Sequence, residues 1–157
     1  MVATPLTVAN PYIRLDKTKH YWGTTIATLA SPSRAELDAM TDLSTNLEEA
    51  AGFTISGSTV SSQSFVGAAL NLQGPKSVDD SSLRIRNSLT GTDARTIMTQ
   101  DLAGYIVVFP EGDVSGRKMD VFQVIVNAVP KGPGIADPAT TTFQFAVTAY
   151  ALRVTVP

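Results

Sequence analysis

The chain contains no cysteine and only one histidine, His20, among its 157 residues. The absence of cysteine excludes disulfides and thiolate metal sites, and a single histidine excludes any metal site that needs two. A Ser–His–Asp triad would have to use His20, which lies in DKTKHYWG beside two lysines and two aromatic residues. We interpret His20 as a structural or solvated residue, and we expect no catalytic residue, no cofactor and no metal.

Charged side chains are also scarce. They make up 17% of the chain, against about 25% in an average soluble protein, whereas apolar residues make up 43%. The net charge of −2 is unlike that of a sequence-reading DNA-binding protein, which normally carries a concentrated basic patch. This low fraction of charged residues, with many apolar ones, predicts that another molecule covers part of the protein's surface.

No apolar run approaches the roughly 18 residues that a membrane-spanning helix needs, so we expect no membrane contact. The first twenty residues lack the basic and apolar regions of a signal peptide. Together with the missing cysteine, this predicts assembly inside a cell. The length fits a single domain, which we expect to span residues 1–157.

Two segments carry helix signals. In SPSRAELDAM, Ser33 and Glu36 are spaced as a capping box, in which each side chain satisfies a free backbone N–H at the helix start. A second short helix is expected in DARTIMTQ, with Thr92 as its N-cap and Asp93 near its positive end. The rest of the chain is rich in strand signals, so we predict a mainly β fold.

The segment 57–78, GSTVSSQSFVGAALNLQGPKSV, combines many serines and glycines with scattered large apolar residues. It is either a long loop or a hairpin arm that orders against a partner. Because Phe65, Leu70 and Leu72 are too apolar for a solvated loop, we expect them to contact another subunit.

The last third of the chain carries the clearest strand signals. Residues 104–110 form a continuous apolar run, and residues 118–129 alternate with both faces largely apolar. In residues 141–156 the apolar positions change parity, which predicts a bulge or a break near Tyr150–Ala151. Strands with two apolar faces need two covers, and the second must be a helix or a neighbouring subunit.

The stretch EGDVSGRKMDVFQVIV, residues 111–126, superficially resembles a phosphate-binding loop. A Walker A loop reads G-x-x-x-x-G-K-[ST] and opens a helix. Here the glycines are one residue too close, Met119 stands where the hydroxyl is needed, and a strand follows. We therefore predict a β-hairpin turn. Its charged tip is either solvated or forms inter-subunit salt bridges through Glu111, Asp113, Arg117 and Lys118.

Four stretches in this order give the sequence a family resemblance: SPSRAELDAMTDLS followed by GFTISGS, then DDSSLRI, GTDARTIMTQDLAGYIVVF and GDVSGRKMDVFQVIV. They cover roughly residues 20–129. In them the chain resembles the tail tube (major tail) proteins of long-tailed, non-contractile bacteriophages, particularly phages that infect actinobacteria. Residues 60–78 depart from the pattern of these relatives.

The resemblance implies a β-sandwich or barrel-like fold and self-assembly into hexameric rings that stack into a hollow tube in the virion tail. Implied partners are further copies of the chain, the tape-measure protein, the tail terminator and distal tail proteins, and genomic DNA that passes through the lumen without sequence-specific binding. Assembly is expected in the host cytoplasm. Residues 57–78 would form an inter-ring arm, and residues 1–19 an N-terminal arm.

Two further expectations bear on this role. A DNA conduit should not attract phosphates, so we expect a neutral or acidic lumen. The acids of residues 31–50 motivate this: Glu36, Asp38, Asp42, Glu48 and Glu49, against the single Arg34. The alternative function is a β-sandwich binding module, such as a capsid decoration or adhesin domain. A small hydrolase that depends on His20 ranks last.

Overall fold

The structure of the protein, a computed structural model, describes residues 17–62, 70–89, 92–129 and 139–157. Strands dominate and the two helices are short, so the predicted mainly β fold is confirmed. The elements in chain order are β1 Lys19–Gly23, α1 Arg34–Asp38, β2 Thr41–Asp42, β3 Leu47–Ala51, β4 Ile55–Ser62, β5 Leu70–Val78, β6 Ser81–Arg86, α2 Ala94–Ile97, β7 Ala103–Phe109, β8 Lys118–Ala128 and β9 Thr140–Thr155.

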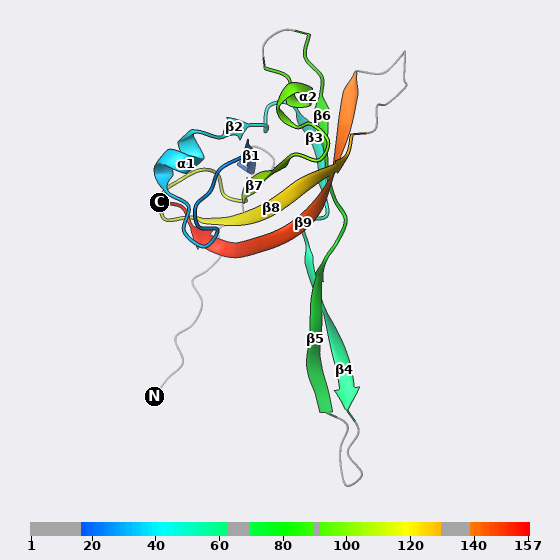
Figure 1. Cartoon of the computed structure of the whole chain (residues 1–157). Helices are drawn as coiled ribbons and strands as arrows, with labels where there is room; N and C mark the ends of the chain where they lie inside the picture. Colours follow the sequence, from blue (N-terminus) through cyan, green and yellow to red (C-terminus); the bar gives the residue numbers. More distant parts are fainter. Residues whose placement is uncertain (1–16, 63–69, 90–91, 130–138) are drawn as a thin grey trace.

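Seven of the strands form one antiparallel sheet in the order β2-β1-β7-β8-β9-β6-β3. The sheet curls strongly, so that β1 and β3 approach each other across an incomplete barrel (Figure 1). The hairpin predicted from EGDVSGRKMDVFQVIV is confirmed, because β7 pairs with β8 from Ala103 opposite Ile125 to Val108 opposite Asp120.

Both faces of the sheet are apolar, as predicted, and each has its own core cluster. Ile106 and Val107 are neighbours on β7 and are both fully buried, but Ile106 belongs to the larger cluster and Val107 to the smaller one. The larger cluster includes Met98, at the end of α2, and the smaller includes Leu37 of α1. The second cover is therefore a helix of the same chain, and two-sided burial is not itself evidence for an oligomer.

The N-cap predicted for α1 is confirmed, whereas the N-cap of α2 differs from the predicted one. The predicted capping box is present at α1, where Ser33 accepts from the Glu36 backbone and the Glu36 carboxylate accepts from the Ser33 backbone. At α2 the N-cap is Asp93, whose carboxylate accepts from Arg95 N at 3.2 Å, and the prediction of Thr92 was wrong. A carboxylate at this position also binds the Arg95 guanidinium, which a threonine hydroxyl cannot do in the same way.

Strand β9 is continuous, and its pairing with β8 shifts three times, once at an extra β8 residue between Val126 and Ala128 and twice at extra residues of β9. The register skips one residue between Val147 and Ala149, and again between Ala151 and Val154. The single irregularity predicted at Tyr150–Ala151 is thus two bulges, one on each side of that pair. The strand also changes the face that it buries. Phe143 and Phe145, early in β9, lie in the larger cluster, whereas Val154 lies in the smaller cluster on the other face of the sheet.

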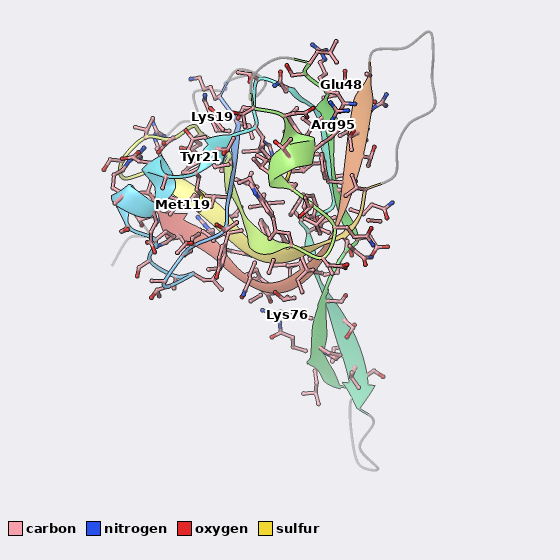
Figure 2. All side chains as sticks on the ribbon, turned by 45° about the horizontal axis from the view of Figure 1, so that its top comes forward. Lys19, Tyr21, Glu48, Lys76, Arg95 and Met119 are labelled. Atoms are coloured by element: carbon pink, nitrogen blue, oxygen red, sulfur yellow. The ribbon has the colours of Figure 1, made fainter. Side chains whose placement is uncertain are left out.

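Strands β4 and β5 form a separate two-stranded sheet that projects away from the body (Figure 1). Of the two alternatives for residues 57–78, the structure therefore shows a hairpin arm. Figure 2 shows Lys76 near the base of this arm, where it pairs with Gly57. Phe53 lies before β4 and has a positive φ of 55°.

Candidate functional site

The arm, β4 with β5, has two chemically different faces. Val60 and Leu72 are direct cross-strand partners, and both side chains are exposed, by 52% and 55%. On the other face, Thr59 lies opposite Gln73 and Ser61 lies opposite Asn71. The arm therefore presents an apolar pair on one face and polar side chains on the other, and no described part of its own chain covers the pair.

Three predicted contact residues fall on or beside this arm. Leu72 lies at its exposed apolar pair. Leu70 is the first residue of β5, but its side chain lies outside the described residues, as does all of Phe65. Val60 was missed by the sequence reasoning, although it is the only large apolar residue in residues 56–62, SGSTVSS. Its cross-strand position relative to Leu72 was the missing information.

The other four predicted contact residues lie in or beside the β7–β8 connection, residues 110–117. Gly112 and Gly116 have positive φ values of 86° and 84°, a conformation that glycine adopts without strain. Arg117 Nη1 lies 2.6 Å from Glu111 Oε2, and Lys118 Nζ donates to Thr155 Oγ1 at 2.6 Å. The charged tip is thus largely paired within the chain.

Asp113 has an internal partner that sequence reasoning did not find. Arg34 Nη1 and Nη2 lie 2.5 Å and 2.7 Å from Asp113 Oδ1 and Oδ2, and Tyr21 donates its hydroxyl hydrogen to Asp113 Oδ2 at 3.1 Å. The guanidinium holds the pKa of Asp113 below its usual value. Burial and the adjacent carboxylate raise the pKa of Tyr21 to about 12. Figure 2 shows Tyr21 on β1, beside Lys19.

Most acids of residues 31–50 are likewise engaged inside the chain. Glu36 caps α1, and Asp38 and Asp42 pair with Arg34 and Lys19. Glu48, on edge strand β3, lies between two arginines of β6: its Oε1 is 2.8 Å from Arg86 Nε and its Oε2 is 3.3 Å from Arg84 Nε. Three of these five acids, Asp38, Asp42 and Glu48, therefore have cationic partners within the chain.

Part of one sheet face is left uncovered by either helix. Across it, Ala103 of β7, Ile125 of β8 and Ala146 of β9 form a row of register partners. All three are exposed, and none is charged. This row presents a small surface without charged side chains.

His20 is buried within β1, with 9% of its surface exposed. Its backbone N–H donates to Ser44 Oγ, its carbonyl accepts from Leu43 N, and burial lowers the pKa of its ring. Among the described residues, no group of three or more potential metal ligands occurs, and no helix has the length and apolar character to cross a membrane. The notable surfaces of the described chain are thus the arm, the charged tip and the neutral sheet face.

The described chain is thus a curled antiparallel sheet with a projecting hairpin arm that exposes an apolar pair. The family comparison makes this specific. Residues 7–157 match the phage tail tube protein family, and the chain belongs to that family. It is accordingly a structural protein of the virion tail, which assembles with itself and with other tail proteins.

The fold comparison agrees with the family. The chain is similar to a solved structure described as the anti-feeding prophage cap, the AFP tube terminating cap. The likeness has a TM-score of 0.60 at 10% sequence identity and covers 96% of each chain. At this identity it shows a shared fold. No curated protein is significantly similar to the sequence.

Proposed function

We propose that the protein forms the hollow tail tube of a long-tailed, non-contractile phage of the actinobacteriophage type, as hexameric rings that stack. The arm carries this proposal. A two-stranded hairpin is only marginally stable alone in water, and this one exposes Val60 and Leu72 to solvent. Burial of that apolar pair against a neighbouring ring would stabilise both the arm and the stack.

The tube would enclose the tape-measure protein during assembly and conduct DNA during ejection. The row Ala103–Ile125–Ala146 is the best candidate for a lumen lining, because an uncharged sheet face does not bind phosphates. The acids that motivated an acidic lumen are mostly paired, which favours a neutral one. A reconstruction with Arg84, Arg86, Arg117 and Lys118 as the main lumen side chains would contradict this part.

The charged tip is proposed as a secondary contact between subunits. Glu111, Arg117 and Lys118 would exchange their internal partners for those of a neighbour. Asp113 would instead support the contact indirectly, because its carboxylate holds α1 through Arg34.

Electron microscopy of the purified protein at high concentration tests the proposed function. We expect long, hollow tubes of uniform diameter, with six subunits in each ring. A discrete monomer or a closed oligomer at every concentration would instead favour the binding-module alternative.

A further inference from the structure

The arm continues the same two chain segments that form the β3–β6 pair, across a short joint. Ala51 lies opposite Ser82 where β3 pairs with β6, and Ile55 lies opposite Val78 where the arm begins. Three residues separate these two pairs on each segment, so the register is the same on both sides of the joint. The two ladders nevertheless belong to separate sheets, so the pairing is interrupted between them. The joint consists of residues 52–54 and 79–81.

Two consecutive residues of the joint have a left-handed backbone, Gly52 with a φ of 77° and Phe53 with a φ of 55°. Glycine adopts this conformation without strain, whereas a bulky aromatic residue does not. Gly52 is also required by a close approach, because a Cβ atom there would lie 2.2 Å from the Asp80 carbonyl oxygen. A strained residue such as Phe53 persists only where its surroundings hold it in place.

The side chain of Phe53 is held by the larger core cluster. Its ring centroid lies 5.2 Å from that of Phe122 and 6.2 Å from that of Phe145. In an uninterrupted ladder Gly52 would lie opposite Ser81, which is buried and faces inward beside Phe145. Its neighbour Phe53 would then face outward, because successive side chains of a strand alternate. The two positive φ values therefore turn the Phe53 ring into the core.

The backbone of the joint is held by the Ser81 hydroxyl. Ser81 Oγ accepts a hydrogen bond from Phe53 N at 2.9 Å and donates one to the Asp79 carbonyl at 3.1 Å. Asp79 N in turn donates to the Thr54 carbonyl at 3.1 Å. The hydroxyl thus links the segment that enters the arm to the segment that leaves it.

We propose that Phe53 is a positioning residue that fixes the direction of the arm relative to the body, with its ring as the anchor and the Ser81 hydroxyl as a brace. Among the described strands, β4 and β5 pair only with each other, so no ladder to the body orients the arm beyond the joint. Without the anchor, the backbone freedom of Gly52 would let the arm swing. A fixed arm loses less conformational entropy when a partner binds it. The inference concerns the single subunit and does not depend on tube formation.

Pulsed EPR on the full-length protein tests this, because the chain has no native cysteine to interfere with labelling. Nitroxide labels are attached at Ser61→Cys in the arm and Ala146→Cys on β9, both of which are exposed positions. The ten residues from Ala51 to Ser61 reach at most about 36 Å, so the labels stay within the range of the method. In monomeric protein we expect one narrow distance peak, and Phe53→Ala should lose it and give a broad distribution.

Phe109→Leu is the control, because Phe109 is fully buried in the smaller core cluster on the other face of the sheet. It should lower the melting temperature but keep the narrow peak. A broad distribution in the protein that carries only the labels, or a narrow peak in a folded Phe53→Ala protein, would overturn the proposal. Broadening in Phe109→Leu as large as in Phe53→Ala would also overturn it, since the arm would then respond to any loss of core packing.

Ser81→Ala is a second variant that leaves the Phe53 ring in place and removes the brace. We expect it to broaden the peak as well. If Phe53→Ala does not fold, Ser81→Ala decides in the same way, and a narrow peak in that variant would then overturn the proposal. Broadening in a folded Phe53→Ala protein with a narrow peak in Ser81→Ala would support the ring as the anchor and exclude the hydroxyl as a brace.

Discussion

Arg34 of α1 and Asp113 of the β7–β8 connection form a two-pronged ion pair across 79 positions of sequence. The Asp113 side chain is only 11% exposed, whereas that of Arg34 is 44% exposed. The pair joins α1, which contributes Leu37 to the smaller core cluster, to the connection that closes the β7–β8 hairpin. It therefore adds an electrostatic link to the packing of Leu37 beside Phe109 and Met119.

Asp113→Asn should lower the free energy of unfolding at neutral pH by about 1–2 kcal/mol, after allowance for the partly exposed guanidinium. Urea denaturation followed by circular dichroism would measure the loss. Asp38→Asn is the control, because Asp38 binds the same arginine from an exposed position. A loss at Asp38 as large as that at Asp113 would contradict the importance of the buried carboxylate.

The same variant should behave differently in acid. Because the folded-state pKa of Asp113 lies below the ordinary value of 3.8, its stabilising effect is complete above that value and is lost as the pH falls through the folded pKa. The stability difference between wild type and Asp113→Asn should therefore be constant near neutrality and shrink below about pH 4. A difference that stays constant down to pH 2 would exclude this linkage.

Gly104 should not tolerate a side chain. A Cβ atom at this position would lie 2.5 Å from the Trp22 ring and 2.9 Å from the Gly23 carbonyl oxygen. Gly104→Ala should therefore reduce stability by about 1–3 kcal/mol. Gly57→Ala, with no atom within 4 Å of the added Cβ, should be close to neutral. Equal decreases in melting temperature in the two variants would argue against close packing of Trp22 over β7.

The strands of the last third could be predicted because their signal is local. Alternation or a continuous apolar run identified β7 and β8, and the Ser33–Glu36 spacing identified the start of α1. Strand β3 was not recognisable, because its sequence LEEAA consists of good helix formers. It is a strand since β6 offers a paired edge, a non-local interaction that outweighs propensity.

The candidate site, like the fold, was predictable from the sequence only where its signal is local. Apolar residues in a Ser- and Gly-rich segment indicated the arm, but the pairing of Val60 with Leu72 depends on hairpin register. The charges of residues 111–118 were visible, yet their partners were not, because Arg34 is distant in sequence. Composition thus indicated which segments carry exposed apolar or charged side chains, and only the fold showed which charges were already paired.

Val107→Asp should abolish stable folding. Val107 is fully buried in the smaller core cluster, and an unpaired carboxylate there costs several kcal/mol, comparable to the whole margin of about 5–15 kcal/mol. Val114→Asp is the control, because Val114 is 54% exposed in the β7–β8 connection. Cooperative unfolding of a soluble Val107→Asp protein would contradict the burial of β7 on both faces.

Deletion of residues 60–74 should leave a folded subunit that cannot form tubes. The arm pairs only with itself among the described strands, so its removal leaves the seven-stranded sheet intact. Circular dichroism should show a cooperative transition near the wild-type temperature, and electron microscopy should show no tubes. Normal tubes from this variant would refute the assignment of the arm as an inter-ring contact.

A pair of neighbouring substitutions on β5 tests which face of the arm is used. Leu72→Asp places a carboxylate on the apolar face, and Gln73→Asp places one on the polar face. If a neighbour buries the apolar face, an unpaired charge there costs at least about 1.4 kcal/mol per contact, or tenfold in association. The critical concentration for tube formation, measured by sedimentation, should therefore rise at least about tenfold for Leu72→Asp and change little for Gln73→Asp. The opposite ranking would show that the polar face makes the contact, because neither substitution alters the body of the subunit.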